Sequence, residues 1–178
     1  MNEPRTGYEM ENMNLGGKYL TFLLADECYG VQILKVREII GLTDSTRVPG
    51  TPDFVRGVIN LRGKVIPVID LKARLGLGRT ENTEYTCIII MDFESDDRTV
   101  QVGMVVDTVS EVIDIPAEII EPAPGFGVSD RAKYIGGLAR TECGVRILLD
   151  IDNVLDLADF SGTGERTVQD EKVEGVTQ

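Results

Sequence analysis

The stretch FVRGVINLRGKVIPVIDLKARLGL, residues 54–77, decides the fold because the chain repeats it. It aligns without gaps on YIGGLARTECGVRILLDIDNVLDL, residues 134–157, at an offset of 80 positions. Upstream, GVQILKVREII at 30–40 aligns on GMVVDTVSEVI at 103–113 at an offset of 73. The segments occur in the same order in both halves, so the sequence predicts two similar units. The difference between the offsets places an insertion in the second half, between residues 114 and 133.

Short apolar runs around these repeats predict β-strands rather than long helices. Some runs alternate apolar and polar residues and others are continuously apolar, and both patterns are typical of strands. Glycines interrupt them at intervals that suit a meander or a small barrel. One helical signal precedes Gly57, because capping residue Thr51 and Pro52 at the first helical position predict about one turn that ends at this glycine. The strand predictions rest on residues 20–24, 65–69, 87–91 and 100–106.

The same patterns predict the domain organisation. The chain is expected to fold as one mainly β domain over residues 18–160, with a first unit at about 18–77 and a second at about 84–157. Residues 1–17 are expected to be a flexible N-terminal segment. Residues 161–178, SGTGERTVQDEKVEGVTQ, are rich in polar and small residues without periodicity, which predicts a disordered acidic tail.

Composition excludes several classes of function. The 178 residues carry a net charge of −12, which repels phosphate and argues against nucleic acid and anionic membranes as partners. The chain contains no histidine, so it lacks the commonest general base and the commonest metal ligand. Most hydrolase and zinc-site interpretations therefore fail, and we expect neither a metal nor a cofactor.

Cysteine usage and hydropathy indicate a cytoplasmic protein. Cys28, Cys87 and Cys143 form no CxxC pair and have no neighbouring ligand set, so we expect buried free thiols in a reducing compartment. The longest continuous apolar runs fall far short of the ~18 residues that a membrane-spanning helix needs. We therefore expect no direct insertion into a membrane.

One enzymatic alternative remains, in which the repeated Asp70 and Asp150 share a proton as a carboxylate pair, with Asp107 as a further candidate. Asp70 and Asp150 each end an apolar strand and precede a short helical pattern, where a carboxylate caps free N–H groups. Capping explains both residues with ordinary chemistry. The glycine-containing segments at 76–81 and 124–130 lack the context of a phosphate-binding loop, so we interpret them as turns.

The repeat also contains a reversal of charge, since Arg62 in the first unit corresponds to Glu142 in the second. From about Tyr19 to Leu157 the chain resembles the CheW family of chemotaxis coupling proteins. The motifs are YLTFLLADECYGVQILKVREII, VPGTPDFVRGVINLRGKVIPVIDLKARLG, VGMVVDTVSEV and YIGGLARTECGVRILLDI, in the order and spacing of the family.

The resemblance implies two tandem SH3-like five-stranded β-barrels with short helices, no catalytic activity and a role in signal transduction. Members link the cytoplasmic tips of transmembrane chemoreceptors to the regulatory domain of the histidine kinase CheA, at receptor arrays on the inner face of the membrane. The same fold occurs in that kinase domain and in coupling proteins with an attached receiver domain, and the length of this chain favours the stand-alone adaptor.

The resemblance also implies a set of partner-binding residues. They come from the segment after the second strand, from the GVxNLRG motif and from a segment of the second unit, and they are Val36, Glu38, Gly57, Asn60, Arg62, Val109 and Val112. Apolar character alone favours core packing for the three valines. The alternative for the two charged residues is a solvated or mutually paired side chain.

A spatial prediction follows from the charge reversal. Glu38 and Arg62 offer opposite charges in the first unit, whereas the corresponding Glu111 and Glu142 carry like charges. We therefore predict that Glu38 and Arg62 lie close together and act as one partner-binding pair, because a guanidinium can bind a carboxylate through two hydrogen bonds.

Overall fold

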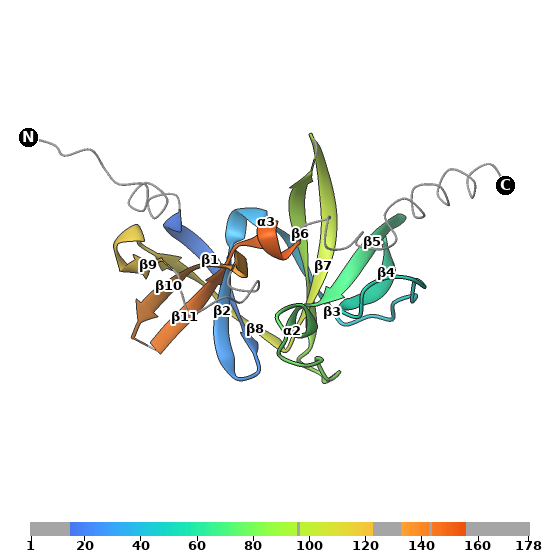
Figure 1. The fold of residues 1–178 in the computed structure, drawn as a ribbon, viewed down its shortest axis with the longest axis horizontal. Helices are drawn as coiled ribbons and strands as arrows, with labels where there is room; N and C mark the ends of the chain where they lie inside the picture. Colours follow the sequence, from blue (N-terminus) through green and yellow to red (C-terminus); the bar gives the residue numbers. More distant parts are fainter. Residues whose placement is uncertain (1–14, 96, 123–132, 143, 156–178) are drawn as a thin grey trace, which may run out of the picture.

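The computed structural model of the protein describes residues 15–95, 97–122, 133–142 and 144–155. The residues before 15 and the predicted acidic tail at 161–178 lie outside these ranges. Strands dominate the described chain (Figure 1). In chain order the elements are β1 (Gly17–Leu24), β2 (Glu27–Gln32), η1 (Ile33–Lys35), β3 (Val36–Gly41), β4 (Val55–Leu61), β5 (Lys64–Asp70), α2 (Leu71–Arg74), β6 (Cys87–Ser95), β7 (Arg98–Val106), β8 (Thr108–Ile115), η2 (Ala117–Ile119), β9 (Ile120–Glu121), β10 (Ile135–Thr141), β11 (Gly144–Leu149) and α3 (Ile151–Val154).

The strands form two sheets, and each sheet mixes strands of the two sequence repeats. The first barrel has five strands in the order β3-β6-β7-β5-β4, and the second has six in the order β8-β1-β2-β11-β10-β9. Strands β1 to β5 of the first repeat correspond to β6, β7, β8, β10 and β11 of the second. Each barrel therefore joins the first two strands of one repeat to the last three strands of the other. The sixth strand of the second barrel, β9, is only two residues long. The mainly β fold with two SH3-like units is confirmed.

Each barrel takes strands from both repeats of the chain. The parallel strand pairs that join the two repeats, which we call seams, lie at equivalent positions in the two barrels. In the first barrel β5 runs parallel to β7, with Val68 opposite Gly103. In the second, β11 runs parallel to β2, with Leu148 opposite Gly30. The sheets thus differ from the contiguous units expected at about 18–77 and 84–157, because these parallel seams pair strands from different halves of the chain.

A shared apolar core joins the two barrels. Its largest cluster combines Phe22 of the second barrel with Ile69 and Met104 of the first. A smaller cluster fills each barrel separately. Tyr19, in the cluster of the second barrel, is almost fully buried, and this burial raises the pKa of its phenol above the usual 10.0.

Arg74 of α2 lies at the junction of the two repeats. Its guanidinium carbon is 4.5 Å from the ring centre of Phe54 and 4.8 Å from that of Tyr134, which is the equivalent of Phe54. Its Nε donates a hydrogen bond of 2.8 Å to the carbonyl of Val154, the equivalent of Arg74 itself. One buried cation therefore contacts matching positions of both repeats.

The predicted helical turn before Gly57 is wrong. The N–H of Val55 donates to the carbonyl of Pro52 at 3.0 Å, which closes a turn, and β4 begins at Val55. Thr46 and Val58 exchange two backbone hydrogen bonds of 2.8 Å, which hold the chain extended through Gly57. Gly57 has a φ of 141°, and a β-carbon there would lie 2.2 Å from the carbonyl oxygen of Thr46. This close approach, not a helix end, is what requires glycine.

The capping interpretation of Asp70 and Asp150 is confirmed. The carboxylate of Asp70 accepts from the N–H of Ala73, and that of Asp150 accepts from the N–H of Asn153, each at 3.4 Å. Each aspartate therefore caps the short helix that follows its own strand.

The cysteine prediction is only partly correct. Cys28 and Cys87 are free thiols, but each is partly rather than fully buried. Cys143 lies outside the described residues.

Candidate functional site

Glu38 and Arg62 form the ion pair that the sequence predicts. Nη1 of Arg62 donates to Oε1 of Glu38 at 2.7 Å, and Nη2 donates to Oε2 at 2.6 Å. The two parallel hydrogen bonds fix the planes of both groups relative to one another. The side chain of Arg62 is 68% exposed and that of Glu38 is 26% exposed, so the pair is accessible to a partner.

The β4–β5 hairpin positions Arg62. Arg62 and Gly63 have φ values of 51° and 85°, which is typical of the two central residues of a type I′ turn. Oδ1 of Asn60 accepts from the N–H of Gly63 at 2.9 Å and stabilises this turn. Asn60 therefore shapes the hairpin that presents Arg62, and its side chain contributes to the site indirectly.

The predicted valines occupy β3 and β8, which are edge strands of the two sheets. Val36 and Val109 are partly buried against the shared core, whereas Val112 is 48% exposed. Sequence reasoning missed Ile39, the equivalent of Val112, which follows Glu38 on β3 and is 43% exposed. The repeat carried this signal, because Ile39 and Val112 coincide at the offset of 73.

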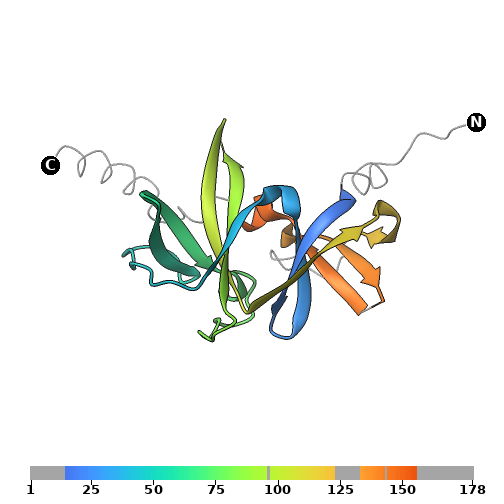
Figure 2. The ribbon, with the colours of Figure 1, turned by 180° about the vertical axis from the view of Figure 1, so that it is seen from behind.

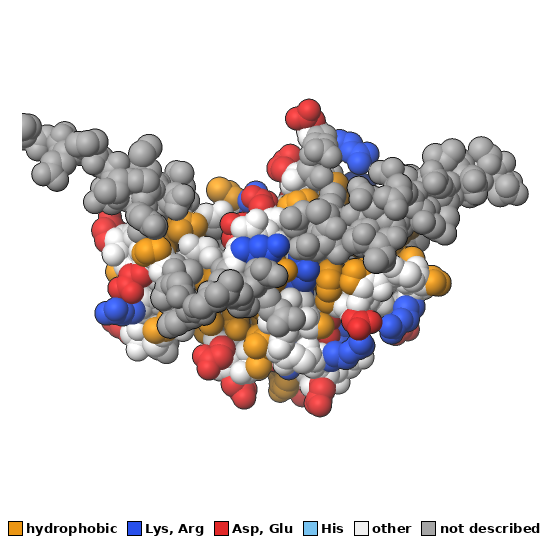
Figure 3. Space-filling model, in the orientation of Figure 1, with side chains coloured by type: hydrophobic (Ala, Val, Ile, Leu, Met, Phe, Trp, Pro, Cys, Tyr) orange, Lys and Arg blue, Asp and Glu red, His pale blue; other side chains and the backbone are white. Residues whose placement is uncertain are grey.

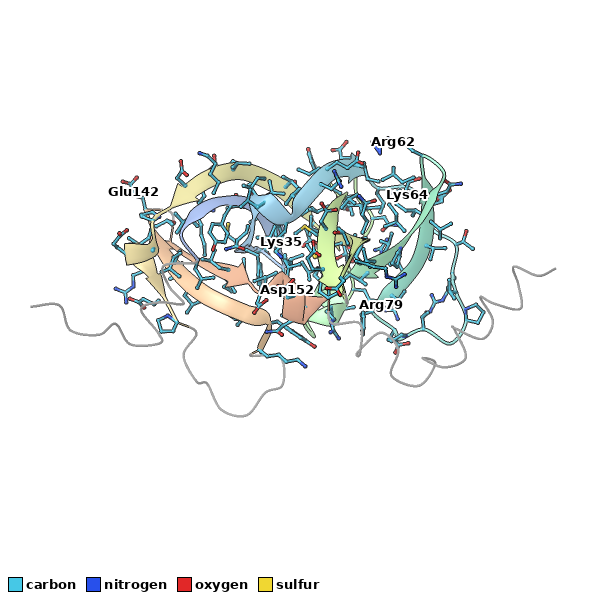
Figure 4. All side chains as sticks on the ribbon, turned by 90° about the horizontal axis from the view of Figure 1, so that it is seen from above. Lys35, Arg62, Lys64, Arg79, Glu142 and Asp152 are labelled. Atoms are coloured by element: carbon cyan, nitrogen blue, oxygen red, sulfur yellow. The ribbon has the colours of Figure 1, made fainter. Side chains whose placement is uncertain are left out.

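The two edge strands cross the same face of the molecule. Strands β3 and β8 both run across the side seen in Figure 2. Figure 4 shows Arg62 and Glu142 toward opposite ends of the molecule, with Lys35 and Asp152 near the centre of the view. Among the described residues Glu142 makes no ion pair, so the Glu38–Arg62 pair has no counterpart at the equivalent positions of the second barrel.

Gly57 lies near the start of β4, at the other end of that strand from the turn that carries Arg62. Its contact with Thr46 gives it a structural role. The structure thus brings Glu38, Asn60 and Arg62 together at one hairpin and places Val109 and Val112 on β8.

Asp70 and Asp150 do not form a carboxylate pair. Asp150 lines a cleft of about 510 Å³ with Lys35 and Asp152, whose side chains lie 3.5 Å apart. Asp70 lines a different cleft, where it accepts from the N–H and the hydroxyl of Thr80, each at 2.9 Å. Two aspartates in separate clefts cannot share one proton.

Charged side chains could also form a metal site among the described residues or a basic tract on the face shown in Figure 3. The described residues contain no cluster of three or more metal-binding side chains. On the face shown in Figure 3, acidic and basic side chains are interspersed with apolar ones. No helix in the described ranges combines the length and apolar character needed to cross a bilayer.

Comparison with known proteins extends this picture. The family model described as a CheW-like domain matches residues 18–159. The chemotaxis protein CheW of Klebsiella aerogenes is 41% identical over 141 residues, which cover 79% of this chain and 82% of that protein. The chemotaxis protein CheW of Bacillus subtilis is 36% identical over 141 residues, covering 79% and 88%. The crystal structure of scaffolding protein TtCheW from Thermoanaerobacter tengcongensis matches with a TM-score of 0.71 at 36% identity, covering 81% of this chain and 95% of that one.

Fold and comparisons together define a scaffold protein of chemotaxis built from two strand-exchanged barrels. The chain belongs to the CheW family.

Proposed function

We propose that the protein is a non-catalytic adaptor that couples the tips of transmembrane chemoreceptors to the regulatory domain of the histidine kinase CheA. It acts in the cytoplasm, at receptor arrays on the inner face of the membrane. The proposed partner-binding residues are Val36, Glu38, Gly57, Asn60, Arg62, Val109 and Val112. Gly57 and Asn60 contribute through the backbone geometry that they maintain.

The accessible Glu38–Arg62 pair is the observation that carries this proposal. A bidentate pair of exposed groups contributes only about 0 to 1 kcal/mol to folding, so stability is a weak reason for its presence. Exposed apolar side chains also lie on the two edge strands, at Ile39 of β3 and Val112 of β8. Apolar anchors supply affinity for a docked helix and neighbouring charges set its orientation, which suits a helical receptor tip.

Reconstitution of the full chain with receptor-containing membranes and CheA tests the proposal. We expect the protein to raise the autophosphorylation of the kinase and to make it respond to receptor ligand. We also expect no phosphate turnover by the protein alone. Kinase activity and ligand response that stay unchanged when the protein is added would contradict the coupling function.

A matched control uses the exposed ion pair of the second barrel. Nη2 of Arg140 lies 3.0 Å from Oε1 of Glu121, and both side chains are exposed. Arg140→Ala removes an ion pair of the same chemistry from a different place. Arg62→Ala should reduce coupling while Arg140→Ala leaves it intact, and equal effects of the two variants would contradict a specific role for Arg62.

A further inference from the structure

Among the described residues, Arg146 of β11 is a buried cation without a carboxylate partner. Only 8% of the residue is exposed. Its Nε donates to the hydroxyl of Thr141 at 3.2 Å and its Nη1 donates to Sγ of Cys28 at 2.7 Å, and these are its hydrogen-bond partners among the described residues. No described residue accepts a hydrogen bond from its Nη2. Charged side chains are seldom buried without a counter-charge, so this arginine needs another explanation.

The fold itself does not require a cation at this position. Its equivalent in the first barrel is buried Ile66, which lies opposite Ile59 across the strand pair. In the second barrel Arg146 lies opposite the small residue Ala139. The exchange of two isoleucines for an alanine and an arginine keeps the space filled and adds a positive charge. The second barrel is therefore specialised at this position.

The guanidinium of Arg146 donates a hydrogen bond to the sulfur atom of Cys28. Cys28 lies on β2 and Arg146 on β11, so their contact crosses the parallel seam that joins the two halves of the chain. The equivalent of Cys28 in the first barrel is Gln101, so the thiol is as specific to this barrel as the arginine. Cys28 is only partly buried, which gives a small reagent access to the sulfur.

We propose that Cys28 is an oxidation site at which peroxide forms a sulfenic acid whose oxygen is held by Arg146. The sulfur attacks one oxygen of hydrogen peroxide, an S–O bond forms and the O–O bond breaks. The sulfur loses two electrons, and the departing hydroxide takes the thiol proton and leaves as water. The new oxygen lies within reach of the guanidinium of Arg146 and accepts hydrogen bonds from it, with Nη1 and Nη2 as donors. Arg146 therefore stabilises the oxidised form of Cys28, and a cysteine without a neighbouring arginine would not gain this stabilisation.

Peroxide labelling of the full chain tests this site. We would treat the Cys143→Ser variant with hydrogen peroxide, trap sulfenic acid with dimedone and quantify each cysteine by peptide mass spectrometry. Cys87 is the internal control, because it is also a partly buried free thiol, its Sγ donates to the carbonyl of Tyr85 at 3.2 Å, and no described cation donates a hydrogen bond to it. We expect Cys28 to be labelled at least about tenfold faster than Cys87, as one direct charge contact permits.

Two variants separate the charge from the shape of Arg146. Arg146→Met keeps much of the side-chain volume without charge, and it should reduce labelling of Cys28 to the rate of Cys87. Arg146→Lys should retain part of the difference. Equal labelling of the two thiols in the Cys143→Ser protein, or labelling of Cys28 that Arg146→Met leaves unchanged, would overturn the proposal. The comparison of Cys28 with Cys87 needs no change at Arg146, so it decides even where Arg146→Met fails to fold.

Discussion

Gly57 shows how a single missing β-carbon fixes the path of the first barrel. A β-carbon would lie 2.2 Å from the carbonyl oxygen of Thr46, and this atom belongs to backbone that cannot rotate away. We expect Gly57→Ala to lower the free energy of unfolding by at least about 2 kcal/mol, because it adds a clash to an unfavourable φ. Thermal unfolding should show a Tm lower by roughly 4 to 8 °C.

The matched control for this prediction is Gly136→Ala. A β-carbon at Gly136 meets its nearest neighbour at 3.6 Å, which is ordinary van der Waals contact. This variant should change the free energy of unfolding by less than about 1 kcal/mol. Similar losses for the two alanine variants would show that the contact with Thr46 is not what requires glycine at position 57.

The Glu38–Arg62 pair should matter more for binding than for stability. Arg62→Ala and Glu38→Ala should each weaken binding of a receptor-tip fragment, with a change in folding free energy of no more than about 1 kcal/mol. The two losses should be less than additive in the double variant, because each substitution removes the same interaction. Calorimetric titration of the four proteins measures the coupling. Fully additive losses would mean that the two residues contact a partner independently.

The helices α2 and α3 have similar aspartate caps, but removal of the two caps should lower the free energy of unfolding by different amounts. Asp150 caps α3 and also accepts from the side chain of Asn153 at 3.0 Å. Asp70 caps α2 and additionally binds Thr80 through two buried hydrogen bonds of 2.9 Å, which attach the segment between the repeats to the first barrel. Asp150→Ala should cost about 1 kcal/mol and Asp70→Ala about 2 to 4 kcal/mol, because the latter leaves buried donors unsatisfied.

Urea unfolding measures this difference as a shift of the denaturation midpoint, provided that the slope m of the unfolding free energy against urea concentration stays constant. Asp150→Asn and Asp70→Asn are the matched controls, since asparagine also caps helices and retains one acceptor oxygen. They should recover most of the loss at position 150 and less at position 70. Equal losses for the two alanine variants would show that the bonds to Thr80 add nothing to the cap.

Sequence patterns predicted the strands and caps better than the pairing of the strands. The repeat identifies β2 with β7 and β5 with β11, but it does not say which copy of one strand pairs with which copy of the other. Pairing within a repeat and pairing between repeats satisfy the same apolar pattern, and only the three-dimensional seam distinguishes them. Gly57 was misread for a similar reason, since its contact with Thr46 is formed by a loop rather than by its own neighbours.

The candidate site was predictable where charge broke the repeat and unpredictable where packing decided exposure. Arg62 and Glu38 stood out because their equivalents carry like charges, and the structure brings them together. Exposure of Ile39 and Val112 depends on their place at sheet edges, which apolar character does not reveal. The contact between Arg146 and Cys28 spans 118 positions and arises from the exchange of strands, which the repeat alone does not predict.

At the scale of the whole molecule, Arg74 should contribute more to stability than its hydrogen bond to Val154 alone. It packs between Phe54 and Tyr134 and bonds to Val154, so it joins the two repeats. Arg74→Met should lower the free energy of unfolding by about 2 to 4 kcal/mol, since it removes two buried cation–π contacts and leaves a carbonyl without its donor. Calorimetry should show the lower Tm.

Exposed Arg79, five residues away, provides the control. Arg79→Met removes the same charge and adds the same side chain at the surface, and it should leave the Tm within roughly 2 °C of the original. A Tm for Arg74→Met that equals that of Arg79→Met would show that the junction between the repeats does not depend on the buried cation.

The reciprocal exchange of strands also sets an order of events during synthesis. As the chain leaves the ribosome from its N-terminus, β1 and β2 emerge first, but their partners β8 and β11 begin only at Thr108 and Gly144. The strands of the first barrel are complete earlier, once Val106 has emerged. Until β8 and β11 have also emerged, the β1–β2 hairpin carries Leu20 and Phe22 without the strands that flank it in the finished protein. The first two strands of the domain are therefore among the last to be sheltered, and they are where a chaperone would have the longest time to bind.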